Sequence, residues 1–146
     1  MHLLLRFPVA QPPAQVLAGF TRQLFEALAP PFPRLHVLRF DGCQTGDEVN
    51  IELQAGPKRW RWDSLITDNG VLPDGTHYFV DEGQLVPAPL RQWRHRHLIA
   101  PSSTGGSVIV EDITYSTGRA WLDVLIYPAM WAQFRLRGPV YRRWFK

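Results

Sequence analysis

The sequence predicts an α+β protein in which a run of antiparallel strands lies between a short helical region and a C-terminal helix. Three observations lead to this fold class. Apolar residues recur at three- and four-residue spacing in segments 12–29 and 121–145, which is the period of a helix. Between these segments, short stretches with alternating polar and apolar residues are separated by residues typical of turns. Strands that follow one another through short turns pair antiparallel, so a meander is expected.

The length predicts a single domain that covers residues 1–146. A chain of 146 residues can bury roughly two-thirds of its unfolded surface. The one cysteine, Cys43, excludes an intramolecular disulfide and is typical of a reducing compartment. Arg6 interrupts a short apolar run at the start, and Asp123 and Pro128 interrupt the best candidate for a membrane span. We therefore expect a cytoplasmic protein without a signal peptide or a membrane-spanning segment.

The first elements are a strand and a pair of helices. The strand covers His2–Phe7, and we predict that Pro8 ends it because proline cannot donate to a strand ladder. Within segment 12–29, Gly19-Phe20-Thr21 divides two short helices, and Thr21 is placed to cap the second. The proline-rich stretch 30–33 ends the helical region.

Six strand segments follow, and a C-terminal helix completes the chain. The strand segments are 35–41, 48–54, 59–67, 76–81, 93–100 and 107–115. Turns are expected at Asp68-Asn69-Gly70, Pro73-Asp74-Gly75 and 102–106, where residues that favour turns cluster. In the last segment, Pro128 suits the first turn of a helix. Gly138-Pro139 is expected to kink or restart the helix, because a proline ring clashes with the carbonyl four residues earlier.

The stretch Trp-Arg-His-Arg-His carries the most informative pattern in the chain. Period-2 alternation sends Trp93, His95 and His97 to one face of the strand, and Arg94 and Arg96 to the other. A face that combines a large ring with two imidazoles is typical neither of an apolar core nor of a solvated surface. It indicates a partly polar internal cavity.

The order of elements resembles that of the START-like, or SRPBCC, superfamily with its helix-grip fold. A subgroup of bacterial SRPBCC ligand-binding proteins, related to polyketide cyclase-like proteins, carries a pattern like F-x-D-x-Q-x-x-G-P-F-x-x-W-x-H-x-H. Its counterparts here are Phe79, Asp81, Gln84, Pro89, Trp93, His95 and His97. Glu111, Ile113 and Tyr115 resemble the acidic, aliphatic and tyrosine residues of the family's next strand, and Phe134 and Arg137 resemble its F-x-x-R.

The resemblance implies a curved antiparallel sheet of about six to seven strands, in the order β-α-α-β-β-β-β-β-β-α, wrapped around a long C-terminal helix. The pattern departs from the family at Ala88 and Leu90, where Gly and Phe are usual, at the spacing of Gln84, and at Glu111, where Asp is common. Superfamily members bind lipids, hormones or polyketides in a cavity between sheet and helix, and some are aromatases or cyclases.

We therefore expect binding of a small, mostly apolar molecule that is lipid-, polyketide- or aromatic-like. A cavity of roughly 300 to 1,000 Å³ is usual for such ligands. The expected lining combines rings with polar groups: Trp60, Trp62, Phe79, Asp81, Trp93, His95, His97, Glu111, Tyr115 and Trp131. Each ring taken alone is better explained as part of an ordinary core, but together they exceed what a sheet under one helix requires.

Acid–base catalysis is the enzymatic alternative in the same cavity. A cyclase or dehydratase needs a proton donor and acceptor beside a carbonyl or enol, and the candidates are His95, His97 and Glu111. No Gly-rich phosphate loop and no nucleophile elbow points to a specific reaction. The simpler interpretation is that the imidazoles form hydrogen bonds to Glu111, Asp81 or Tyr115 and stabilise the sheet.

Two other kinds of partner receive weaker support. His95 and His97 with Glu111 could form a metal site, but this spacing alone is weak evidence, and we expect no metal and no cofactor. The net charge of +3 could indicate nucleic acid. The basic patch would consist of Arg59, Arg61, Arg94 and Arg96. Alternation places the tryptophans on the opposite face, so the aromatic stacking that single strands need is missing.

Overall fold

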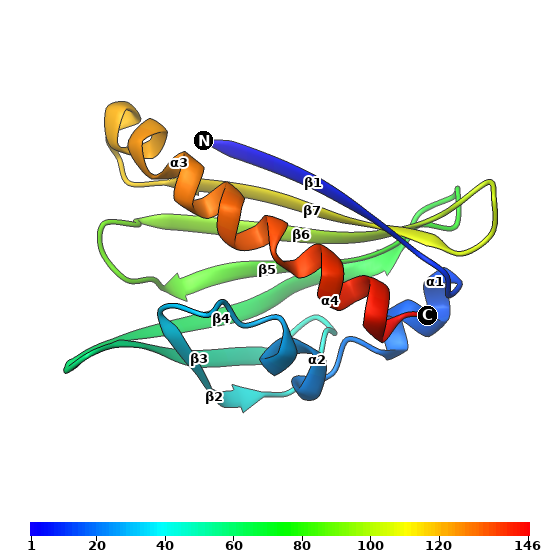
Figure 1. Ribbon diagram of the computed structural model, residues 1–146, viewed down its shortest axis with the longest axis horizontal. Helices are drawn as coiled ribbons and strands as arrows, with labels where there is room; N and C mark the ends of the chain where they lie inside the picture. Colours follow the sequence, from blue (N-terminus) through cyan, green and yellow to red (C-terminus); the bar gives the residue numbers. More distant parts are fainter.

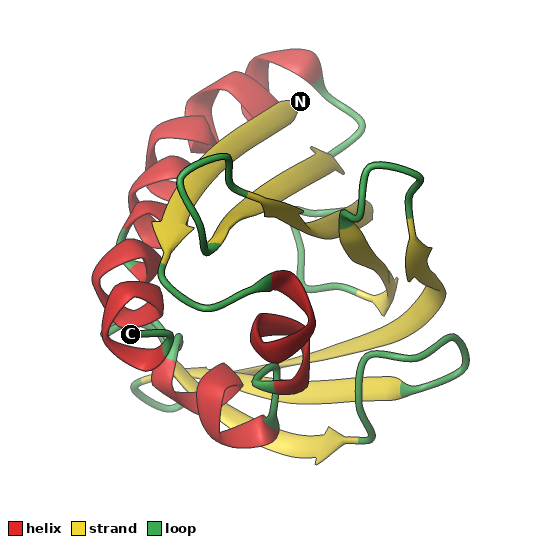
Figure 2. Ribbon diagram, turned by 90° about the vertical axis from the view of Figure 1, so that its right-hand side faces the viewer, coloured by secondary structure: helices red, strands yellow, loops and turns green.

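The computed structural model describes residues 1–146 and confirms the predicted α+β fold class. Seven antiparallel strands form one sheet in the order β1-β7-β6-β5-β4-β3-β2. The C-terminal helices lie obliquely across this sheet (Figure 1), and the view along the sheet shows the strands curling beside them (Figure 2). None of the helices combines the length and the apolar character that crossing a membrane requires.

All the predicted elements are present. The strands are β1 (His2–Val9), β2 (Arg34–Phe40), β3 (Glu48–Ala55), β4 (Lys58–Val71), β5 (His77–Leu85), β6 (Gln92–Pro101) and β7 (Ser107–Ser116). The helices are α1 (Pro13–Ala18), α2 (Arg22–Ala27), α3 (Ala120–Arg135) and α4 (Arg137–Trp144). Thr21 caps α2 as predicted, because its hydroxyl accepts a hydrogen bond from the backbone N–H of Leu24 at 3.4 Å.

Three strands extend beyond their predicted ends, and β5 runs to Leu85 instead of Asp81. Pro8 lies inside β1 instead of ending it, opposite Val108 of β7. Because β1 is at the edge of the sheet and pairs only with β7, a residue without an N–H is tolerated there. The predicted turn Asp68-Asn69-Gly70 is part of β4 and pairs with β5. Pairing prevails over local turn preference here, and Gly70 leaves room for the ring of Tyr78, 3.2 Å from where a Cβ would lie.

Of the two predictions about prolines in the C-terminal helices, one is wrong and one is confirmed. Pro128 lies inside α3, eight residues after the helix begins at Ala120, and not in a first turn. Pro128 lacks the N–H that would have donated to the carbonyl of Val124. Both residues are exposed, so water can donate to that carbonyl instead. The predicted restart at Gly138-Pro139 is confirmed, because α4 begins at Arg137 and Pro139 falls in its first turn.

The core fixes α4 against the first strand. Phe7 of β1 and Tyr141 of α4 are both buried, with ring centroids 5.6 Å apart. Gly138 permits this contact, because a Cβ at that position would lie 2.9 Å from the Phe7 ring. Phe145 is 1 % exposed and completes the packing at the end of the helix. This packing determines which residues of α4 face the middle of the sheet.

Candidate functional site

The register of three neighbouring strands brings the predicted polar residues together. His97 of β6 lies directly opposite Phe79 of β5 and Glu111 of β7. His95 lies opposite Asp81 of β5. Directly paired residues of adjacent strands project to the same face of a sheet, and this face is the inner one, since His95 and His97 are 4 % and 8 % exposed. The alternation expected from the sequence is confirmed.

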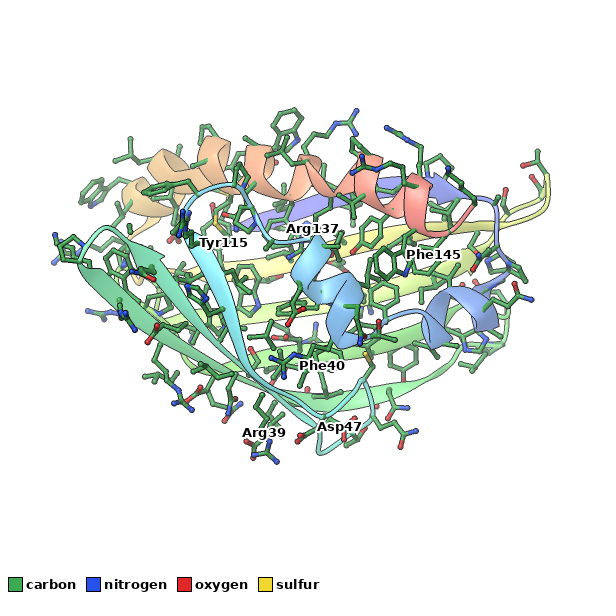
Figure 3. The ribbon with its side chains drawn as sticks, turned by 60° about the horizontal axis from the view of Figure 1, so that its bottom comes forward. Arg39, Phe40, Asp47, Tyr115, Arg137 and Phe145 are labelled. Atoms are coloured by element: carbon green, nitrogen blue, oxygen red, sulfur yellow. The ribbon has the colours of Figure 1, made fainter.

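Glu111 is the centre of a buried hydrogen-bond network. Its side chain has no exposed surface, and its Oε2 forms a short contact with Nε2 of His95. Its Oε1 accepts a hydrogen bond from the Tyr141 hydroxyl at 2.6 Å and another from Nη1 of Arg137 at 3.2 Å. Nδ1 of His97 lies 3.5 Å from Oε2 and makes no hydrogen bond. One carboxylate therefore connects the sheet to α4 (Figure 3 shows Arg137 on the sheet-facing side of the helix).

The charges in this network are strongly biased. Burial disfavours the Glu111 carboxylate, but Arg137 and then His95 more than offset this and hold the pKa of Glu111 well below its usual range. Burial, followed by the Glu111 charge, raises the pKa of Tyr141 well above its usual range, so the phenol keeps its proton and donates it. Burial, and next His95, lower the pKa of His97, which favours a neutral imidazole.

Aromatic packing holds the polar side chains in place. The His97 ring stacks on Phe79 with centroids 4.3 Å apart and planes 14° from parallel. The His95 and His97 rings are 3.7 Å apart. The Arg137 guanidinium lies 4.2 Å from the centre of the Phe134 ring, a cation–π contact from α3. These contacts limit the rotation of both imidazoles and of the arginine.

A cavity of about 210 Å³ lies beside this network, between strands β2–β6 and the helices α2, α3 and α4. Its walls are mostly apolar: Leu35, Val49, Ile51, Leu53, Trp62, Trp93, Met130 and Phe134. One end is polar: Ser64, Asp81, His95, His97, Gln133 and Arg137. The volume is below the range expected from the sequence, because rings such as Trp62 and Trp93, 4.9 Å apart, occupy part of the space.

Two polar atoms of the cavity lining are buried without a hydrogen-bond partner. They are Oδ1 of Asp81 and Nδ1 of His97. Burial raises the pKa of Asp81, although His95 and a hydrogen bond from Ser64 act in the opposite direction. Buried polar atoms in proteins are nearly always paired, so two unpaired ones in the lining of one cavity are an exception.

Comparison with known proteins identifies the fold. No protein-family model and no curated protein sequence matches the chain. Among solved structures, protein CV1439 from Chromobacterium violaceum aligns with a TM-score of 0.64 and 14 % identity over 96 % of each chain. A norcoclaurine synthase point mutant from Thalictrum flavum, in complex with a transition-state analogue, aligns with a TM-score of 0.62 and 10 % identity over 88 % of this chain and 82 % of that one. This chain has the START-like helix-grip fold.

A third helix-grip structure is the di-domain ARO/CYC BexL from the BE-7585A biosynthetic pathway. It aligns with a TM-score of 0.58 and 12 % identity over 94 % of this chain, which corresponds to 45 % of the BexL chain. The architecture implied by the resemblance, a curved antiparallel sheet with a long C-terminal helix, is therefore confirmed.

Six of the ten predicted lining residues are at the cavity. Trp62, Asp81, Trp93, His95 and His97 line it, and Phe79 lines a space of about 30 Å³ that adjoins it under α2. Glu111 lies behind the two histidines and reaches the cavity only through them.

Three predicted lining residues lie elsewhere. Trp60 shares the face of Trp62, but it lies close to the β3–β4 turn and is 36 % exposed. Trp131 is 43 % exposed on the outer side of α3. The prediction failed here because α3 is apolar on all sides, so the spacing of its apolar residues does not show which side faces the core. Tyr115 is fully buried, and its hydroxyl donates to the Asp123 carbonyl at 2.9 Å. It fastens the start of α3 to β7.

The sequence interpretation missed the helical half of the site. Phe134, Arg137 and Tyr141 are spaced three and four residues apart, so they share one side of the C-terminal helices. An arginine between two rings on the buried side of a helix signals a buried carboxylate partner. That signal was present in the sequence, but nothing in it pointed to Glu111 on a strand 26 residues away.

Proposed function

We propose that the protein binds a small, mostly apolar molecule with one polar end in the cavity beneath α3. The observation that carries this proposal is the unpartnered Oδ1 of Asp81 beside an apolar-walled space. Leaving a buried polar atom unpaired costs about 1–3 kcal/mol. A ligand hydroxyl or N–H group that pairs with Oδ1 of Asp81 recovers that free energy, and the apolar remainder of the ligand fills the rest of the cavity.

The size of the cavity narrows the class of ligand. An apolar cavity of about 150 Å³ accommodates a benzene molecule. The cavity of about 210 Å³ therefore suits a substituted single ring or a small fused pair of rings better than a long acyl chain. The indoles of Trp62 and Trp93 contribute flat apolar surface for such a ring.

The electrostatics favour a neutral polar group on the ligand. The pKa of Asp81 is raised by burial and that of His97 is lowered by burial, so both shifts act toward the uncharged forms. The positive charge of Arg137 is already compensated by Glu111. A phenol or another hydroxyl fits this environment, whereas a free carboxylate would lack a cation of its own. BexL and norcoclaurine synthase, which share the fold, are consistent with cyclic ligands.

The test is binding of neutral aromatic alcohols, with 1-naphthol and phenol as probes. Binding is measured by tryptophan fluorescence and by chemical-shift changes of the indole N–H groups. We expect Asp81→Asn to change the affinity for 1-naphthol relative to naphthalene, because only the former carries a hydroxyl. Met130→Trp, which fills the cavity, should weaken binding about tenfold or more. Ala129→Trp is the matched control, because Ala129 is exposed on the outer side of the same helix.

Failure of all such probes to bind the wild-type protein, with no small molecule retained in native mass spectrometry of protein from its own host, would reject the proposal. Equal weakening by Ala129→Trp and Met130→Trp would also count against it, because the effect would then not arise in the cavity.

Acid–base catalysis is a second candidate, and the contact between His95 and Glu111 favours it. An imidazole held by a buried carboxylate is oriented for proton transfer through its other nitrogen, and His95 lines the cavity. A cysteine nucleophile is disfavoured, since burial raises the pKa of Cys43 to about 12. The test is exchange of the α-protons of 2-tetralone in deuterated water. His95→Gln should abolish exchange, and no exchange above the solvent rate with the wild type would reject this candidate.

A further inference from the structure

The outer side of the C-terminal helices exposes an unusual amount of apolar surface. Large apolar side chains that are 43 % to 66 % exposed lie along it: Trp121, Val124, Leu125, Trp131 and Leu136. Residues three and four positions apart share a side of a helix, so most of these form one continuous stripe along α3. We call this stripe, together with the basic residues described next, the outer helix surface.

The same surface is basic and lacks exposed acid. Its exposed charged residues are Arg119, Arg135, Arg142, Arg143 and Lys146. From residue 119 to 146 the single acidic residue is Asp123, which is 7 % exposed and accepts a hydrogen bond from the backbone N–H of Thr117 at 2.7 Å. No exposed carboxylate therefore lies on this surface.

Four arginines of the central strands differ from the exposed basic residues of the C-terminal helices. On the outer face of the sheet, Arg59, Arg61, Arg94 and Arg96 each lie within 3.2 Å of a carboxylate. None of the five basic residues of the outer helix surface forms an ion pair within the chain. Their positive charges remain uncompensated, beside apolar side chains that no other part of the chain covers.

We propose that the outer helix surface docks on an anionic lipid membrane. Such a membrane offers both properties that the surface requires: anionic headgroups for the arginines and an interfacial region in which Trp and Leu side chains are stable. Tryptophan in particular favours this interfacial depth. A second copy of the chain would instead bring the same positive charges together without any carboxylate to compensate them.

The orientation of α3 makes such docking compatible with an intact fold. Its inner side is occupied by Phe134 and Met130, which pack on the core and line the cavity, so the exposed stripe is not needed for folding. At about 1.5 Å per residue, the 16 residues of α3 present roughly 24 Å of helix to the membrane plane. The proposal does not depend on what the cavity holds, although docking would bring the cavity beside the lipid.

The test is co-sedimentation of the full chain with sucrose-loaded vesicles of phosphatidylcholine alone or in an equimolar mixture with phosphatidylglycerol. We expect binding to the mixed vesicles, little binding to the neutral ones, and loss of binding as salt is raised. Leu125→Glu should abolish binding. Arg142→Glu/Arg143→Glu should weaken it by about 20-fold or more, since each basic residue near an anionic surface is worth about fivefold.

Two control variants make the same changes elsewhere. Val71→Glu alters an exposed apolar residue on β4, and Arg59→Glu/Arg61→Glu reverses two exposed arginines of the sheet. Both should leave vesicle binding unchanged. The proposal is overturned if the controls weaken binding as much as the helix variants do. It is also overturned if the wild type ignores anionic vesicles, whether it stays a monomer or forms a dimer that Leu125→Glu dissociates in sedimentation equilibrium.

Discussion

Both faces of the β6–β7 pair carry a basic side chain opposite a carboxylate, but the inner pair is buried and the outer pair is partly exposed. On the inner face, His97 lies opposite Glu111, whereas one residue away on the outer face Arg96 lies opposite Asp112. The Glu111 side chain is fully buried, but those of Arg96 and Asp112 are 42 % and 18 % exposed. An exposed ion pair contributes about 0–1 kcal/mol, whereas a buried charge is strongly destabilising once it loses its partner. Burial, more than residue type, decides what each carboxylate is worth.

Removal of each carboxylate in turn should separate the two faces most clearly. We expect Glu111→Ala to lower the free energy of unfolding by about 3–5 kcal/mol, because Arg137 would be left buried without its partner. Asp112→Ala should lower it by less than about 1 kcal/mol. Urea denaturation measures both, and equal losses in the two variants would contradict the comparison.

Two tyrosines that donate to carboxylates provide the next contrast. The Tyr141 hydroxyl donates to Glu111 in the interior at 2.6 Å, and that of Tyr78 donates to Asp68 at the surface at 3.2 Å. Tyr141→Phe should cost about 1.5–3 kcal/mol, the usual value for a hydrogen bond to a charged group. Tyr78→Phe should cost no more than about 0.5 kcal/mol. A small effect at Tyr141 would indicate that Arg137 alone satisfies Glu111.

The inner face should also make stability depend on pH. Burial depresses the pKa of His97, so the unfolded chain binds a proton that the folded chain does not, and stability is lost as pH falls below the unfolded value of about 6.5. The slope approaches about 1.4 kcal/mol per pH unit. Glu111 adds a loss at lower pH, as pH falls through its depressed folded pKa. His97→Gln should flatten the curve just below about pH 6.5; an unchanged slope would contradict this assignment.

Asp81 should give a smaller effect of opposite sign. Its pKa is raised by burial, so stability falls as pH rises from the unfolded value of about 3.9 to that raised pKa, and the full destabilising effect is present above it. Asp81→Asn should therefore raise the melting temperature by about 2–4 °C at pH 8, with the gain shrinking toward pH 4. Asp63→Asn is the control, since Asp63 is only half-buried and forms an ion pair with Arg61, and it should not show this gain. A gain that persists unchanged at low pH would point to a cause other than ionisation.

Patterns of short range made most of the fold predictable. Alternation along β6 assigned His95 and His97 to the inner face because the strand period of two leaves no other choice once Trp93 is buried. Turn chemistry failed at Asp68-Asn69-Gly70, since pairing with β5 extends the strand through a sequence that would otherwise turn. The edge position of β1, which permits Pro8 inside it, depends on the whole sheet and cannot be deduced from the strand alone.

The site was predictable only as far as the strands supply it. Contacts between α4 and the sheet depend on how Gly138 and Phe7 pack, which is a property of the assembled core. For this reason the pairing of Arg137 and Tyr141 with Glu111 was missed, although all three residues are recognisable in the sequence. The outward position of Trp131 has the same origin, because α3 is apolar on both sides.

The hydrogen bonds of the C-terminal helices to the sheet are unevenly distributed. At the start of α3, Asp123 accepts from Thr117 and from the hydroxyl of Tyr115, and in α4 both Arg137 and Tyr141 donate to Glu111. Between them, no side chain from Val124 to Leu136 is hydrogen-bonded to a strand. The helical pair is therefore hydrogen-bonded to the sheet at its two ends, and the segment between them lies over the cavity. Outward movement of that segment would break no side-chain hydrogen bond to the sheet, so it would cost less than separating either end of the helical pair.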